Sequence, residues 1–323
     1  MPEGPTLADL ESAARIVYAA MPPTPQYAWP LLAERAGCEV WVKHENHTPV
    51  GSFKVRGGLV FVGQLWRDGP AKAGLIAATR GNHGQSLAFA ARRFGFPATV
   101  VVPEGNSREK NAAMRALGAE LIVHGRDFHD ALAHARALAA ERGLLFVPSF
   151  DPLLPRGIAS YALELFRTAP PLDAVYVPIG QGSGIAAVIA ARDALGLSTA
   201  VIGVVSERLP SYALSFRARK AVETPPADTI ADGVACRIPD PAGLEIVLRG
   251  AEDVVTVSEE EIRDAMRVLF SATHNVVEGA GAAALAAVLA GRGGRRDRRV
   301  AVVATGGNVD RDVFARVLAD APA

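Results

Sequence analysis

The chain has 323 residues, of which 50% are apolar, and its 34 basic and 34 acidic side chains give a formal net charge of zero. This length predicts about two domains with a large core, and the balanced charge argues against a protein that binds nucleic acid or lies on a membrane surface. No apolar run reaches the ~20 residues of a membrane span, and the N-terminus lacks a secretory pattern, so we expect a cytoplasmic protein.

The first part of the sequence predicts one helix and then a regular alternation of strands and helices. An amphipathic helix over 6–20 is ended by a cluster of prolines. The strand-like run 38–43 leads through a turn to Lys54, which should therefore stand where a helix begins. Beyond it we expect strands at 75–78, 98–102, 120–123 and 144–147, separated by helices at 85–94, 107–117 and 128–142.

The second part resumes the alternation after residue 150. We expect strands at 174–178, 200–205 and 299–304 and helices at 157–167, 185–195, 259–270 and 280–290. A capping box, Ser258 with Glu261, precedes the helix at 259. Four prolines make 207–239 resemble a long functional loop or cover rather than core. The alternation as a whole predicts parallel sheets in two α/β domains, with the ligand at the carboxyl ends of the strands.

Lysine is scarce in this chain, which draws attention to Lys54. There are five lysines against 29 arginines, so arginine supplies positive charge wherever charge alone is needed. Lys54 lies among small, apolar and glycine neighbours in the heptapeptide Gly51-Ser-Phe-Lys-Val-Arg-Gly57. A lysine in this setting can lose its proton and attack a carbonyl, which arginine cannot do. The alternative is an ordinary solvated lysine at a helix N-terminus.

Two glycine-containing turns follow predicted strands and open predicted helices. Gly180-Gln-Gly-Ser-Gly184 can offer backbone N–H groups and a helix N-terminus to a phosphate. Its spacing departs from the dinucleotide fingerprint, and the chain has no Walker-type motif. Thr79-Arg-Gly-Asn-His-Gly-Gln85 makes a second anion-binding turn, in which the Asn82 amide can donate a hydrogen bond to a phenolate-like oxygen. The turn 180–184 could also be a plain connection between strand and helix, and His83 in the second turn could be a structural histidine.

The heptapeptide around Lys54 closely resembles the pyridoxal-phosphate lysine motif of the serine/threonine dehydratase family, and further motifs occur in family order over nearly the whole chain. The resemblance implies fold type II, as in the tryptophan synthase β subunit, with two three-layer α/β domains built on parallel sheets. A small domain is expected over 49–148, and a large cofactor-binding domain over 1–48 and 149–323. The implied cofactor is pyridoxal 5'-phosphate, carried by Lys54 as a Schiff base, and Lys54 is also the catalytic base.

The family's site residues can be placed on the matching positions of this sequence. The cofactor-binding residues are Phe53, Lys54, Asn82, Gly180, Gln181, Gly182, Ser183, Gly184, Glu278 and Thr305, of which Thr305 faces the pyridine nitrogen. The substrate-binding residues are Ser52, Arg80, Gly81, Asn82 and His83. The backbone amides of the loop 79–85 receive the substrate carboxylate. Arg80 is a departure, because relatives that racemise serine carry a serine there as the acid/base on the second face, and arginine is too basic for that role. We expect Arg80 either to turn to solvent or to receive a substrate carboxylate.

A metal ion is not expected. Relatives with a divalent-metal site use a carboxylate-bearing loop after the strand that ends near Ser206. Glu207 could match the first ligand of that site, but Ala213 stands where an aspartate is needed. The two cysteines, Cys38 and Cys236, have neither disulfide-framework nor metal-site spacing.

The resemblance implies a dehydratase that converts a 3-hydroxy amino acid, most simply L-threonine or L-serine, to a 2-oxo acid and ammonia by α,β-elimination. The alternatives are a dehydratase for 3-hydroxyaspartate or phenylserine, a serine-racemase-like enzyme, and a catalytically inactive small-molecule-binding protein. The expected partners are an amino-acid substrate and a second copy of the chain in a homodimer, with no nucleic acid and no membrane. The chain ends about fifteen residues after its last motif, so no C-terminal regulatory domain and no feedback by isoleucine are expected.

Overall fold

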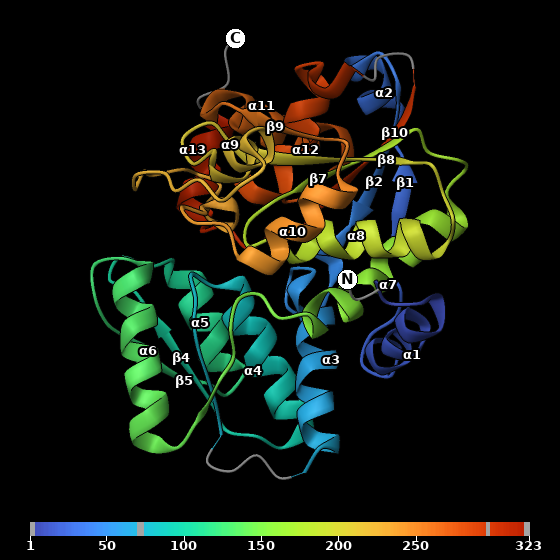
Figure 1. Cartoon of the computed structure of the whole chain (residues 1–323). Coiled ribbons are helices and arrows are strands. Elements are labelled where there is room, and N and C mark those ends of the chain that lie inside the picture. Colours follow the sequence, from blue (N-terminus) through green and yellow to red (C-terminus); the bar gives the residue numbers. More distant parts are fainter. Residues whose placement is uncertain (1–3, 70–73, 295–297, 320–323) are drawn as a thin grey trace.

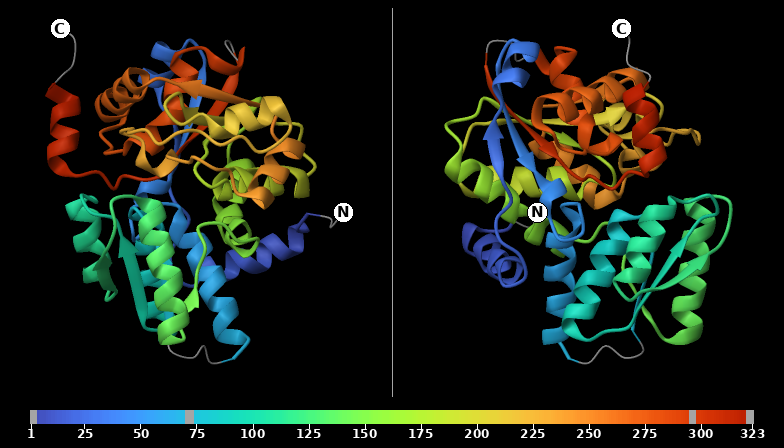
Figure 2. Two further views of the ribbon diagram at one scale, coloured as in Figure 1. Left: turned by 60° about the vertical axis from the view of Figure 1, so that its left-hand side comes forward. Right: turned by 180° about the vertical axis from the view of Figure 1, so that it is seen from behind.

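The structure is a computed structural model that describes residues 4–69, 74–294 and 298–319. Within these residues two sheets form, one of six strands in the order β1-β2-β10-β7-β8-β9 and one of four in the order β5-β4-β3-β6. Figures 1 and 2 show the four-stranded sheet and its helices below the six-stranded sheet in every view. The predicted α/β fold class is confirmed. All strand pairs are parallel except β1 with β2, which is antiparallel.

The bounds of the elements agree closely with the predicted alternation. The strands are β1 (Gln26–Ala28), β2 (Glu39–His44), β3 (Leu75–Ala78), β4 (Ala98–Val102), β5 (Glu120–Val123), β6 (Leu145–Phe146), β7 (Ala174–Pro178), β8 (Ala200–Ser206), β9 (Asp253–Val257) and β10 (Arg299–Ala304). The helices are α1 (Leu7–Tyr18), α2 (Pro30–Ala36), α3 (Lys54–Arg67), α4 (Asn82–Phe94), α5 (Arg108–Ala116), α6 (Phe128–Arg142), α7 (Leu153–Thr168), α8 (Ser183–Ala194), α9 (Ser211–Ala218), α10 (Pro241–Gly250), α11 (Glu259–Thr273), α12 (Gly279–Leu289) and α13 (Arg311–Ala319). Among the described helices, none is both long and apolar enough to cross a membrane.

Each sheet lies between two layers of helices because its strands are apolar on both faces. In β7, Val175 and Val177 belong to the core that contains residues of α7 and α8. Ala174 and Tyr176, which alternate with them, belong to the core that contains residues of α11 and α12. The four-stranded sheet is built in the same way, with α3 and α4 on one face and α6 on the other. The parallel sheets that the alternation of strands and helices predicted are therefore present.

The prediction that 207–239 is a long functional loop or cover, and not part of the core, is wrong in part. Eight of its residues form α9, and Tyr212 and Ala213 of that helix are fully buried in the core. The helix was not predicted because prolines interrupt this stretch, and Pro210 itself stands at the N-cap of α9. The sequence analysis also missed β1, α2, α10, β9 and α13. A local signal for α10 was present, because Asp240 caps its N-terminus and Pro241 takes the first helical position.

A group of charged side chains, the buried ion network, holds the first turn of α3 against β2 and α7. Its members are Lys43, Glu45, Arg56 and Glu164. Arg56 donates to Glu45 Oε2 and to Glu164 Oε1, both at 2.7 Å. Lys43 Nζ donates to Glu164 Oε2 at 2.6 Å. These side chains are at most 8% exposed, and their two positive and two negative charges balance. The network therefore fixes the helix start that carries Lys54.

Candidate active site

A cavity of about 130 Å³ lies where strand ends and helix starts from both sheets meet. Thr79 follows β3, Pro178 ends β7, and Thr305 follows β10. Helices α3, α4 and α8 begin at the wall with Lys54, Asn82 and Ser183. The carboxyl ends of parallel strands and the N-termini of the helices that follow them form one edge of each sheet. The cavity therefore lies at the edges where the sequence predicted a ligand.

The structure gathers nearly all of the predicted site residues around this cavity. Its wall includes Phe53, Lys54, Arg80, Gly81, Asn82, His83, Gly180, Gln181, Gly182, Ser183, Gly184, Glu278 and Thr305. Ser52 is the exception. It is fully buried outside the cavity wall and forms an isolated antiparallel bridge with Gly306. Its backbone N–H donates to Thr48 Oγ1, so Ser52 supports the turn before Lys54.

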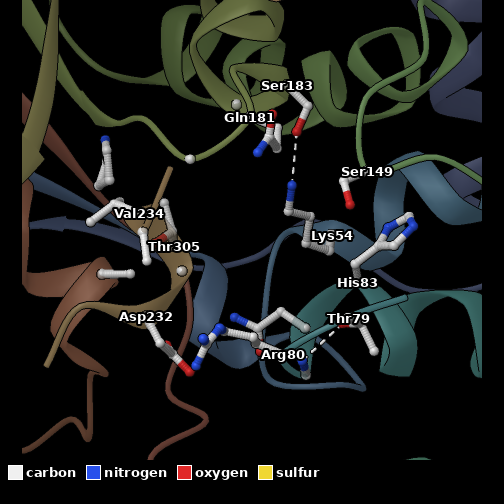
Figure 3. Close-up of a pocket in the computed structure, with 18 of the residues that line it drawn as sticks. Lys54, Thr79, Arg80, His83, Ser149, Gln181, Ser183, Asp232, Val234 and Thr305 are labelled. Atoms are coloured by element: carbon white, nitrogen blue, oxygen red, sulfur yellow. Dashed lines mark hydrogen bonds between the residues drawn. The ribbon is translucent and has the colours of Figure 1, made fainter. Parts of the chain in front are cut away.

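Lys54 occupies the first position of α3 and extends its side chain into the cavity (Figure 3). Its Nζ donates to Ser183 Oγ at 2.9 Å, and no ion pair of Lys54 occurs within the described chain. Loss of hydration on burial lowers the pKa of Lys54 to about 8. Two backbone contacts hold its position, because Phe53 N donates to the Thr305 carbonyl and Ser86 Oγ donates to the Lys54 carbonyl. Lys54 is thus a positioned amine with an appreciable neutral fraction near neutral pH.

The glycine loop 180–184 approaches other parts of the chain so closely that side chains do not fit. A Cβ on Gly180 would lie 2.4 Å from the Gly233 carbonyl oxygen. Gly182 caps the start of α8 with φ 97°, and a Cβ there would lie 2.9 Å from Tyr212 Oη. The first turn of α8 leaves its N–H groups directed out of the helix toward the cavity. Backbone donors and a helix N-terminus that face a cavity are suited to a phosphate.

A second group of charged side chains, the cavity triad, lines the side of the pocket that lies across from Lys54. It consists of Lys110, Asp232 and Glu278, and Lys110 Nζ lies 2.7 Å from Asp232 Oδ2 and 3.3 Å from Glu278 Oε2. Burial raises the pKa of Glu278, against the charge of Lys110. Burial opposes the protonation of Lys110, but Glu278 and Asp232 outweigh it and raise the pKa of Lys110. The Lys110 ammonium is therefore a fixed positive charge of the cavity.

Asn82 joins this triad to the C-terminal part of the chain. Its Nδ2 donates to Glu278 Oε1 at 2.6 Å, and its Oδ1 accepts from Asn308 Nδ2 at 2.8 Å. One N–H of the amide remains for a ligand. The first turn of α5, which carries Lys110, is bound in turn by Asp310, whose carboxylate accepts from the backbone N–H groups of Arg108 and Glu109. These contacts tie the first turns of α4 and α5 to the segment that follows β10.

His83 and Arg80 differ in how far they enter the site. The His83 ring lies near Lys54, and burial lowers the pKa of His83 to about 4, so the imidazole is neutral at neutral pH. Its Nε2 is 3.5 Å from the Val147 carbonyl oxygen. Arg80 is exposed at the rim, and no hydrogen bond of its guanidinium occurs among the described residues. Because Arg80 is exposed and also lines the cavity, both expectations for it stay predictions.

The sequence analysis missed several residues of the cavity wall. Lys110 could have been found, because the scarcity of lysine that marked Lys54 applies equally to it. Ser149 follows a predicted strand, as the recognised turns do, but no glycine marks the position. Asp232 and its neighbours Gly233 and Val234 lie in the stretch interpreted as cover, and nothing local shows that they reach the site.

Comparisons with known proteins identify the family to which the chain belongs. The model of a family described as pyridoxal-phosphate dependent enzyme matches residues 17–306. The chain is 35% identical over 314 residues to an L-threonine ammonia-lyase of Thermotoga maritima, covering 97% of this chain and 78% of the relative. It is 34% identical over 303 residues to the catabolic L-threonine dehydratase of Escherichia coli (strain K12), covering 92% and 90%. The crystal structure of a T.th. threonine deaminase superposes with a TM-score of 0.88 at 35% identity, covering 95% of this chain and 99% of the other.

Proposed function

Because the chain belongs to the family of pyridoxal-phosphate-dependent enzymes, we propose that it is a dehydratase that converts a 3-hydroxy amino acid to a 2-oxo acid and ammonia. The substrates we propose are L-threonine and L-serine, since its relatives in Thermotoga maritima and Escherichia coli are named for threonine. The observation that carries the proposal is the Lys54 amine, which has a lowered pKa and lines one cavity together with the glycine loop 180–184.

The side chains and backbone groups present fit the cofactor. Lys54 would hold it covalently, and the glycine loop 180–184 with the first turn of α8 would bind its phosphate. The remaining N–H of the Asn82 amide would donate to the ring hydroxyl oxygen. The Thr305 hydroxyl, for which no hydrogen bond occurs among the described residues, would face the ring nitrogen. When bound, the cofactor supplies a conjugated ring that withdraws the electron pair left at the substrate Cα.

The chain's own groups then bind the substrate and move its proton. The N–H groups of Gly81, Asn82 and His83 at the start of α4 would hold the substrate carboxylate. Lys54 Nζ, freed when the substrate amine takes its place, would remove the proton from Cα as general base. A pKa of about 8 keeps part of the amine neutral at neutral pH, which this step requires. Water leaves from Cβ, and the product is released to hydrolyse to the 2-oxo acid.

Elimination should dominate over racemisation. Racemisation needs an acid/base group on the face of Cα that lies opposite Lys54, and Arg80 stands where related racemases carry a serine. An arginine does not exchange its proton at neutral pH, and Arg80 is exposed at the rim. The same guanidinium could bind the second carboxylate of 3-hydroxyaspartate, which makes that substrate the second candidate.

We further propose that 49–148 forms the small domain and the rest of the described chain the large one, as the two separate sheets suggest. A homodimer in the cytoplasm is the proposed form of the enzyme. Two exposed side chains, Tyr27 in the edge strand β1 and Leu31 in the following helix α2, are available for such an interface. Size-exclusion chromatography with light scattering tests the dimer directly.

Three measurements test the proposed function. Borohydride reduction followed by peptide mapping should locate the cofactor on Lys54, and the Lys54→Arg variant should carry none. A panel of L-serine, L-threonine, 3-hydroxyaspartate and phenylserine, scored for release of 2-oxo acid, should identify the substrate, while chiral analysis of unreacted L-serine measures racemisation. An adduct on another lysine, or a panel without any oxo acid, would contradict the proposed function.

A further inference from the structure

One polar side chain of the cavity wall, Ser149, has no part in the chemistry described so far. It comes shortly after β6, in the segment that leads into α7, and it is half-buried. It lines the cavity together with Lys54 and His83. Figure 3 shows its hydroxyl directed into the space beside these two side chains, on the side of the cavity away from Asp232. The hydroxyl is therefore placed next to the amine that removes the substrate proton.

The other hydroxyl groups of the wall are either hydrogen-bonded or already assigned. Ser183 accepts from Lys54, and Thr79 Oγ1 accepts from two backbone N–H groups of its own turn. In the described part of the chain, the hydroxyl groups of the wall without a hydrogen bond are those of Ser149 and Thr305. Thr305 is proposed above for the cofactor ring. Ser149 is thus the free hydroxyl available to the substrate itself.

We propose that Ser149 binds the β-hydroxyl of the substrate and passes to it the proton with which it leaves as water. This inference rests on the proposed function. Lys54 Nζ takes the proton from Cα and becomes an ammonium. As the Cβ–O bond breaks, its electron pair stays on the oxygen, which takes the Ser149 hydroxyl proton. Ser149 regains a proton from the Lys54 ammonium, so water departs and the amine is neutral again.

The neighbouring groups are poorer donors for this step. His83 is neutral at neutral pH, because burial lowers its pKa to about 4. Lys110 is held by two carboxylates that raise its pKa, and Arg80 does not release its proton. A hydroxyl beside the Lys54 amine can instead relay the proton that this amine has just received. A positioned donor of this kind contributes typically 10²–10⁴-fold to a rate.

The test compares two leaving groups. Hydroxide must be protonated to leave L-serine, whereas chloride leaves 3-chloro-L-alanine without a proton. Ser149→Ala should therefore lower kcat/KM for L-serine by about 100-fold or more, but that for 3-chloro-L-alanine by less than about threefold. Ser149→Thr, which keeps a hydroxyl, should restore most of the activity on L-serine. Cofactor content, measured by absorbance after denaturation, and the melting temperature should match those of the wild type.

Thr305→Val is the matched control, because it deletes the other free hydroxyl of the wall. Since Thr305 is proposed to act on the cofactor ring, this variant should lower both activities by the same factor. The role of Ser149 is disproved if Ser149→Ala leaves L-serine turnover unchanged, or lowers both activities equally while cofactor content is normal, or if Ser149→Thr fails to restore activity. A wild type that releases oxo acid from neither compound would instead contradict the proposed function.

Discussion

The buried ion network and the cavity triad are both built from charged side chains inside the protein, but only one of them is complete. In the network, every charge has a partner of opposite sign, and the side chains are at most 8% exposed. In the triad, two carboxyl groups share the single ammonium of Lys110. Asp232 is 31% exposed, and among the described residues the contact of Glu278 Oε2 is the ion pair with Lys110 Nζ at 3.3 Å. The network is closed to solvent, and the triad opens on a cavity.

This difference indicates that the network serves the stability of the fold and that the triad serves the binding of a ligand. A fully satisfied buried network fixes one arrangement of the chain, and removal of one member leaves an unpaired charge without water. An incomplete group on a cavity wall keeps hydrogen-bonding capacity for a ligand, and it has a perturbed pKa, as functional sites commonly do. Substitutions in the network should therefore lower the free energy of unfolding. Substitutions in or near the triad should change how stability depends on pH and how a ligand binds.

The largest effect is expected from Arg56→Met. It leaves Glu45 and Glu164 buried without the guanidinium that binds both, and this should lower the free energy of unfolding by about 3–5 kcal/mol. Urea denaturation of the apoprotein measures it. Arg142→Met is the control, because its salt bridge with Glu120 is 41% and 50% exposed and should contribute at most about 1 kcal/mol. Equal losses of stability in the two variants would show that the buried ion network contributes no more than an exposed salt bridge.

Lys54 extends the comparison, because it lies two residues from Arg56 and yet pairs with no carboxylate of the described residues. Burial lowers its pKa from 10.5 to about 8, so at pH 8 its neutral fraction should exceed that of an ordinary lysine by about 100-fold. The rate of cofactor attachment to the apoprotein should rise with pH and reach half its maximum near pH 8. Stopped-flow absorbance measures this rate. A midpoint near 10 would mean that the amine is hydrated or paired with an acid.

Lys110→Met should produce a smaller loss of stability that depends on pH. Burial raises the pKa of Glu278 and Lys110 opposes this shift, so the variant should raise the pKa further. A carboxyl group whose folded pKa is raised favours the fold below its unfolded pKa, and this stability is lost as the pH rises through the folded value. The difference from the wild type should grow from near zero at pH 5 to about 1–3 kcal/mol at pH 8. Lys110→Arg, which keeps the charge, should show little pH dependence.

The smallest effect is expected at the outer edge of the network. Tyr18 is 40% exposed, and its hydroxyl donates to Glu164 Oε1 at 3.0 Å. Tyr18→Phe removes this hydrogen bond but leaves Arg56 and Lys43 bound to Glu164, so it should cost about 0.5–1.5 kcal/mol. Thermal and urea unfolding measure it. A loss as large as that of Arg56→Met would place the stabilising contact at the surface rather than in the closed network.

The sequence by itself determined the local features of this protein. Strand and helix periods, the capping box at Ser258 and the two glycine turns depend on neighbouring residues, so they could be predicted without knowledge of the fold. Lys54 was recognised because its heptapeptide is local too. Reasoning about strand ends in parallel sheets predicted the two glycine turns of the cavity wall, whereas Glu278 and Thr305 were placed there by the family resemblance.

Only the tertiary structure decided which distant side chains meet. Lys110 and Asp232 are 122 residues apart in sequence, and Lys43 and Glu164 are separated by 121. The scarcity of lysine could have drawn attention to Lys110, but nothing in the sequence pairs it with Asp232 or pairs Lys43 with Glu164. Ser149 likewise gains its place beside Lys54 only when β6 pairs with β3 and the chain turns toward α7. Burial and pairing depend on contacts made across the fold, and short-range periodicity and composition carry no information about such contacts.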